Sequence, residues 1–179
     1  MPAQEHDTAV VAPAADRAAG LARRLISLIS SFRMSLSSPT WDAELPSEHG
    51  TLRAVRLAQH AGAKRLAANL YELEQGTVVS PLHFHHGNEE LLFVLSGRPT
   101  LRRGPGDEHI LKSGDVVSFL AGPSGVHQIL NRAAEYCRVL IVATNDVPEV
   151  AEQVEDRRLA IITSDGLRLQ PLTEPVAAP

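Results

Sequence analysis

From residue 41 to residue 144 the chain consists of short apolar runs, and each run ends in turn-forming residues. Gly, Pro and Asp gather in GPGD at 104–107 and Gly and Pro in GPSG at 122–125, where they mark turns. The clearest strand candidates are EELLFVLSG at 89–97 and YCRVLIVAT at 136–144. Short strands at intervals of about ten residues are typical of sandwiches and barrels, so we predict an all-β fold.

A second feature is the density of metal-binding side chains. Three histidines and two glutamates fall within HFHHGNEE, residues 83–90. Because side chains alternate along a strand, His83 and His85 point to one face and Phe84 to the other. Two neutral imidazoles, with a carboxylate from an adjacent strand, form a site suited to a divalent metal ion. Further along, His127 in VHQIL offers another imidazole.

The composition limits the class of protein. A chain of 179 residues with 44% hydrophobic residues predicts one domain with some additional chain. The formal net charge of -4 gives no basic field, so nucleic acid is not an expected partner. No apolar run approaches the length of an integral membrane span. The single cysteine, Cys137, excludes an intramolecular disulfide, predicts a cytoplasmic location and is interpreted as a small core residue.

The N-terminal part has a different character. Residues 1–16 are rich in Ala and small or polar residues, and we expect them to be disordered. Residues 17–38 predict an amphipathic helix. Its apolar stripe consists of Leu21, Leu25, Leu28, Ile29, Phe32 and Leu36. Three interpretations stay open: a helix that packs on the barrel or a partner subunit, a membrane-surface or targeting helix, and a true initiator at Met34.

Two residue patterns, one around each group of histidines, match the motifs of a known family. The first comprises Gly76, His83, His85, Glu90 and Gly97. The second comprises Gly114-Asp115, Pro123-Ser124-Gly125, His127 and Asn131. Together they resemble the cupin superfamily, in particular its small single-domain barrels of the cupin 2 type. Each motif departs by one residue from the common spacing, before His83 in the first and between the Pro-x-Gly turn and His127 in the second.

The resemblance implies a fold and a division of the chain. The fold is a cupin double-stranded β-helix, or jelly-roll barrel, with an N-terminal amphipathic helix and extra C-terminal strands. Residues 1–38 would form the N-terminal extension and residues 39–147 the barrel. Residues 148–179 would form a C-terminal extension that packs on the barrel or on a partner subunit. Because an exposed apolar strand edge needs covering, we expect a homodimer.

The resemblance also implies a metal centre. Its ligands are His83, His85, Glu90 and His127. Four ligands on a six-coordinate ion leave positions for water, substrate or dioxygen, as a catalytic site requires. This donor set suits Fe, Mn, Ni, Zn or Cu and does not choose among them. By alternation His86 and Glu89 point away, so we interpret both as non-ligands.

The pocket walls carry fewer signals. Asn69 and Tyr71 share one face of an early strand and are candidates to line the pocket. Arg102 and Arg103 are adjacent, so one of them should point inward if their strand is regular, and an inward arginine would favour an anionic substrate. No catalytic residue can be assigned from the sequence alone.

These observations lead to two hypotheses of function. The first is a metal-dependent enzyme that acts on a small organic molecule, of the oxygenase, isomerase or lyase type. The alternative is a non-catalytic cupin that binds a small ligand or serves as a sensor. A shared fold does not decide between them.

Overall fold

The computed structural model describes residues 34–172. The expected disordered segment, 1–16, and most of the expected helix, 17–38, lie outside the described residues. Residues 34–38 are not helical, and 36–38 form bends. Serines at 35, 37 and 38 compete for backbone hydrogen bonds and Pro39 disfavours a helical residue before it, which explains the absence of a helix at these positions. Among the described residues, no helix has the length and apolar character needed to cross a membrane.

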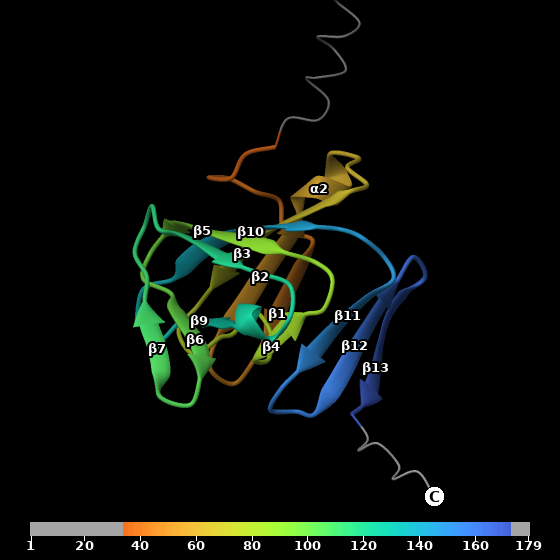
Figure 1. Cartoon of the computed structure of the whole chain (residues 1–179). Coiled ribbons are helices and arrows are strands. Elements are labelled where there is room, and N and C mark those ends of the chain that lie inside the picture. Colours follow the sequence, from red (N-terminus) through yellow and green to blue (C-terminus); the bar gives the residue numbers. More distant parts are fainter. Residues whose placement is uncertain (1–33, 173–179) are drawn as a thin grey trace, which may run out of the picture. The chain divides into compact units, whose positions relative to one another are not determined.

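The described strands form three sheets, and all strand pairs are antiparallel (Figure 1). The largest sheet has the order β1-β2-β3-β10-β5-β8. Its strands are β1 (Ala43–Pro46), β2 (Thr51–Arg56), β3 (Leu66–Leu73), β10 (Cys137–Thr144), β5 (Glu90–Ser96) and β8 (Val116–Phe119). The two long strands predicted from the apolar runs, β5 and β10, lie next to each other near its centre.

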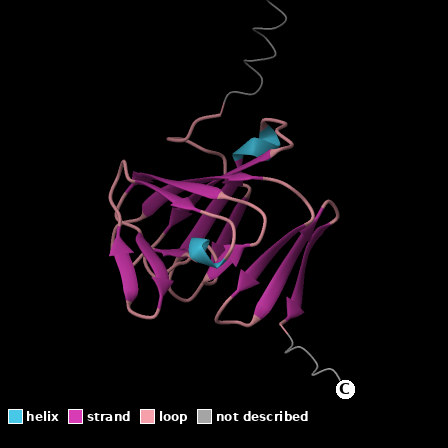
Figure 2. Ribbon diagram, in the orientation of Figure 1, coloured by secondary structure: helices cyan, strands magenta, loops and turns pink. Residues whose placement is uncertain are grey.

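Two smaller sheets complete the fold. One has the order β13-β12-β11-β4, and the other has the order β7-β6-β9. Their strands are β4 (His83–His85), β11 (Glu149–Gln153), β12 (Arg158–Thr163), β13 (Gly166–Pro171), β6 (Thr100–Gly104), β7 (Asp107–Ile110) and β9 (Gln128–Leu130). Within residues 34–172 there are two helical turns, α2 (Leu57–His60) and the 3-10 helix η1 (Pro123–Gly125), so this part of the chain is almost entirely β-structure and loops (Figure 2). The predicted all-β class is confirmed.

The hydrophobic core follows from strand alternation. On β10, Cys137, Val139 and Ile141 are buried, while the residues between them are partly exposed. They pack with apolar side chains from the facing strands. The buried cluster comprises Leu52, Leu73, Leu92, Val94, Leu101, Leu111, Phe119, Ile129, Cys137, Val139 and Ile141. This core gives a rigid support to the strands that carry the histidines.

The chain beyond residue 147 is closely tied to the histidine strand. β11 pairs with β4 in the register Ala151↔His85 and Gln153↔His83. β12 and β13 continue the same sheet as a hairpin. The predicted C-terminal strands therefore exist, and the first of them is the hydrogen-bonded neighbour of the strand that presents His83 and His85.

Candidate metal centre

Three of the four expected ligands converge in the described structure. His83 lies on β4, Glu90 begins β5 and His127 precedes β9. One ligand atom from each lies within 4.8 Å of the others, which is a spacing that a metal ion can bridge. The backbones of His83 and His127 form an antiparallel bridge, with N–H···O distances of 3.1 and 2.8 Å. This bridge holds the two imidazoles side by side, with ring centroids 4.6 Å apart.

Backbone carbonyls fix the tautomers of these two imidazoles. Nδ1 of His83 lies 2.9 Å from the Pro81 carbonyl oxygen, and Nδ1 of His127 lies 2.9 Å from that of Gly125. A carbonyl oxygen only accepts, so each Nδ1 carries the proton and donates it. Each Nε2 then presents its lone pair to the site, which is the form that binds a metal. The His127 ring also stacks on Phe119, with centroids 3.7 Å apart.

The electrostatics keep the donors in their metal-binding forms. Burial, together with the adjacent imidazoles of His127 and His85, lowers the pKa of His83 to about 4, so the ring is neutral at pH 7. Burial by itself would raise the pKa of Glu90. The contact with His127 and the imidazoles of His85 and His83 outweigh this effect, and the pKa lies below its usual value.

Unsatisfied polar atoms in the site fit a cation. Oε2 of Glu90 lies 3.1 Å from Nε2 of His127, yet this buried oxygen has no hydrogen bond of acceptable geometry. With the His127 proton on Nδ1, both atoms are acceptors that face each other. A cation between them would satisfy both, and the imidazole–carboxylate chemistry suits a divalent transition metal. The residues present therefore fit the metal that the fold family implies.

His85 lies at the edge of this group. Its Nε2 is 3.7 Å from Oε1 of Glu90, and its ring centroid is 5.1 Å from that of His83. The other ring nitrogen, Nδ1, is buried without a hydrogen bond and lies 3.4 Å from Oε1 of Glu149. His85 thus stands beside the three converging donors, and its role as a fourth ligand stays a prediction.

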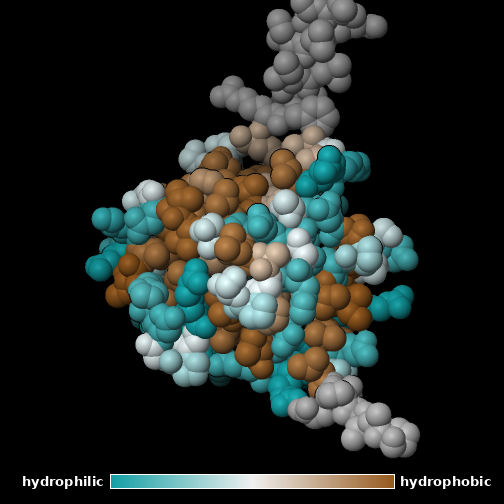
Figure 3. Space-filling view, viewed as in Figure 1, coloured by the Kyte–Doolittle hydropathy of each residue, from teal (hydrophilic) through white to brown (hydrophobic). Residues whose placement is uncertain are grey.

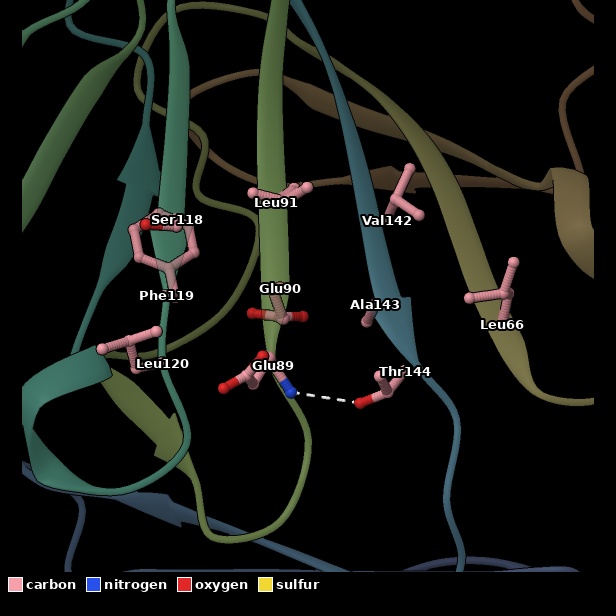
Figure 4. A pocket seen from close by; sticks show the side chains of 10 residues that line it. All are labelled: Leu66, Glu89, Glu90, Leu91, Ser118, Phe119, Leu120, Val142, Ala143 and Thr144. Atoms are coloured by element: carbon pink, nitrogen blue, oxygen red, sulfur yellow. Dashed lines mark hydrogen bonds between the residues drawn. The ribbon is translucent and has the colours of Figure 1, made fainter.

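The two neighbouring side chains that were interpreted as non-ligands point elsewhere. His86 is exposed, and its Nε2 lies 3.4 Å from Oε2 of Glu152. Glu89 is exposed at a groove on the outer face of the largest sheet, where its amide donates to the Thr144 hydroxyl over 3.1 Å (Figure 4). Apolar side chains line this groove, among them Leu66, Leu91, Leu120 and Val142. Apolar surface also extends over β5 and β10 in Figure 3.

A cavity of about 550 Å³ opens onto the metal donors. Asn69 and Tyr71 of β3 line it, as their shared strand face predicted, and Arg56 of β2 lies opposite Asn69 in the register. The hairpin contributes apolar side chains to the other wall. These are Ala160, Ile162 and Leu167. The cavity is therefore partly polar near the donors and apolar along the C-terminal hairpin.

One expectation about the pocket is wrong. Neither Arg102 nor Arg103 lines the cavity. Arg102 donates to Gln128 and to Glu155, which hold its guanidinium away from the site. The cationic side chain at the cavity is instead Arg56, which sequence reasoning missed because its strand carries no motif.

Tyr71 lines the cavity and is not one of the expected ligands, but its pKa is strongly shifted. Burial and the nearby charge of Glu90 raise its pKa to about 12. The phenol therefore stays protonated at neutral pH and can donate a hydrogen bond into the cavity.

Fold and site together define a cupin barrel with a candidate metal centre. Residues 69–143 match the family model described as the Cupin domain. These residues form a cupin domain, and the expected resemblance to the cupin superfamily is confirmed.

Solved structures agree with this assignment. A sugar phosphate isomerase from a cupin superfamily, from Silicibacter pomeroyi, is 25% identical with a TM-score of 0.67; the match covers 79% of this chain and 96% of that one. A putative sugar phosphate isomerase from Acidithiobacillus ferrooxidans is 18% identical with a TM-score of 0.71, over 84% and 99% of the two chains. The second likeness concerns the fold alone. Comparison with curated proteins gives no significant match.

Proposed function

We propose that this protein is a metal-dependent cupin enzyme of the isomerase type, acting on a small hydroxylated molecule that carries an anionic group. The observation that carries the proposal is the convergence of His83, Glu90 and His127 beside a cavity of about 550 Å³. A cavity of this volume is within the range of small-molecule sites. The fourth expected ligand, His85, is part of the proposed set.

The isomerase type is supported by one comparison. The Silicibacter pomeroyi protein is a sugar phosphate isomerase, and the match covers 96% of its chain at 25% identity. Of the three reaction types that the donor set allows, isomerisation is the one that this likeness favours.

The cavity side chains suit such a substrate. A bound divalent metal would supply a Lewis acid for a substrate carbonyl or hydroxyl oxygen. Tyr71 would donate a hydrogen bond to a substrate oxygen, because its pKa of about 12 keeps the phenol protonated. Arg56, which also lines the cavity, would bind the anionic group.

The test uses purified full-length protein loaded with one metal at a time. Interconversion of a panel of aldose and ketose phosphates, with the matching unphosphorylated sugars, is followed by proton NMR. We expect turnover of a phosphorylated member that needs metal and is lost in the His83→Ala/His127→Ala variant. Tyr71→Phe should lower kcat more than it changes KM. Equal metal content of the wild type and the double variant by elemental analysis would refute the metal site.

A non-catalytic binding function is favoured by one observation. Glu90 is the only carboxylate that lines the cavity within residues 34–172, and it belongs to the expected ligand set. A base independent of the metal is therefore not provided there. Binding of a sugar phosphate to the metal-loaded protein without any turnover would favour this function over the isomerase.

Two further proposals concern the setting of the protein. We propose a cytoplasmic location, supported by the single, buried cysteine. We also propose a homodimer, supported by the exposure of the edge strand β13.

A further inference from the structure

A buried carboxylate lies behind the metal site, on the strand next to β4. Glu149 begins β11 and is 3% exposed. A histidine and a backbone amide lie next to its carboxylate: Nδ1 of His85 at 3.4 Å and the amide nitrogen of Gly87 at 3.3 Å. Burying a carboxylate without an arginine or lysine partner costs several kcal/mol unless other groups compensate. The fold nevertheless places this side chain at the back of an expected ligand.

The chain leaves room for this carboxylate. A Cβ atom added to Gly87 would lie 2.8 Å from Oε2 of Glu149, which is too close for the present arrangement. Gly87 is therefore the residue that lets the carboxylate approach both the loop amide and the His85 ring.

We propose that Glu149 is a positioning residue that makes His85 the fourth ligand of the metal. With a metal bound, the carboxylate would accept the proton of His85 Nδ1, which lies 3.4 Å away and has no other hydrogen bond, so the lone pair of Nε2 points to the opposite side of the ring. That side faces Glu90, whose Oε1 is 3.7 Å away. Carboxylates that accept from ligating histidines fix the tautomer and the ring orientation in this way. The inference rests on the proposed metal site.

Glu149 differs from the groups that orient the other two histidines of the site. His83 and His127 are oriented by carbonyls within their own segments, Pro81 and Gly125. His85 is oriented by a residue 64 positions away in a strand that follows the barrel, as the pairing of β11 with β4 allows. The C-terminal strands thereby become part of the metal site.

The test is Co²⁺ binding to the full-length protein, measured by competition with a chelator and by the visible absorption of the bound ion. Glu149→Ala should weaken Co²⁺ affinity by about 10- to 100-fold and change the absorption spectrum. Glu149→Gln should restore part of the affinity, because its amide oxygen still accepts from Nδ1. Gly87→Ala should weaken binding too, since it displaces the carboxylate while keeping both partners.

The matched control is the neighbouring pair on the outer side of the same strands. Glu152 lies 3.4 Å from Nε2 of His86, a contact of the same type and length that does not face the site. Glu152→Ala should leave Co²⁺ affinity and absorption unchanged. If circular dichroism shows that the Glu149→Ala variant is not folded, the Glu149→Gln and Gly87→Ala variants are compared with the wild type instead.

The outcomes separate the two levels of inference. Absence of stoichiometric Co²⁺ binding by the wild type would refute the proposed metal site. Wild-type binding together with unchanged affinity and spectrum in the folded Glu149 and Gly87 variants would refute the positioning role alone.

Discussion

Arg56 is the arginine that lines the cavity among the described residues. Its backbone amide donates to Asp42 over 2.8 Å, but its guanidinium Nε lies 3.9 Å from that carboxylate, so the side chain is only weakly paired. Arg56→Gln should raise KM for an anionic substrate by about three- to tenfold and leave kcat nearly unchanged. Arg132→Gln, which removes an exposed arginine paired with Glu108, is the control. An equal effect on an uncharged sugar would contradict anion binding.

Cys137 gives a second prediction for a single side chain. Burial raises the pKa of its thiol to about 12, so the reactive thiolate is scarce at pH 8. The folded protein should react with a disulfide reagent at least about a hundredfold more slowly than the protein unfolded in guanidinium chloride. Because the chain has one cysteine, the released chromophore reports this residue alone. Rapid labelling of the folded protein would show that its strand opens readily.

The histidine pattern shows how far residue-level prediction reaches. His83, Glu90 and His127 were predicted as ligands because the cupin-like motifs place them at fixed spacings, and the structure brings one ligand atom of each within 4.8 Å of the others. Glu149 and Arg56 leave none: each reaches the site through a strand pairing with another part of the chain. The expected inward arginine at 102 or 103 was wrong for the same reason, since the partners that hold Arg102 away lie far along the chain, Gln128 on β9 and Glu155 in the turn after β11.

At the scale of elements, the turn that ends β5 imposes a strict requirement. Gly97 has φ = 76°, and an added Cβ would lie 2.6 Å from the Cβ of Cys137. Gly97→Ala should therefore combine backbone strain with overpacking and lower the free energy of unfolding by about 2–4 kcal/mol. Gly106 has φ = 75° with no atom near the added Cβ, so Gly106→Ala should cost only about 1–2 kcal/mol. Urea unfolding of both variants measures the difference, and equal losses would contradict the packing argument.

The strands themselves were largely predictable. Apolar runs bounded by turn residues indicated β5 and β10, Asn69 and Tyr71 were placed on an early strand that is β3, and extra strands were expected in residues 148–179, where β12 and β13 lie. The apolar pattern of a strand does not indicate which other strand it pairs with. Alternation identifies the buried face of β11, but only the long-range pairing with β4 reveals that this strand supports the metal donors.

For the whole molecule, the metal donors make stability depend on pH. The pKa of His83 is about 4 in the folded metal-free protein, against 6.5 as its ordinary value. Below pH 6.5 the unfolded chain therefore binds the proton that the folded protein excludes, and stability falls as the pH falls towards 4. The loss should be at most about 3 kcal/mol, from about 1.4 kcal/mol per unit of pKa. Urea unfolding of chelator-treated protein between pH 7 and pH 4 measures it, and His83→Gln should flatten the curve.

The oligomeric state is the last property that the whole fold decides. β13 is the outer strand of its sheet; it pairs only with β12 among the described strands, and all six of its residues are exposed (Figure 1). A second copy related by a twofold axis can pair its own β13 antiparallel to this edge, so that the same surface serves both subunits.

Size-exclusion chromatography with light scattering should give twice the 19.3 kDa of one chain. Leu169→Lys should shift the protein to the monomer without changing Co²⁺ affinity, because Leu169 does not line the cavity. Leu91→Lys, on the outer face of the largest sheet, is the control; a monomeric wild type, or dissociation by Leu91→Lys alone, would rule out pairing through β13.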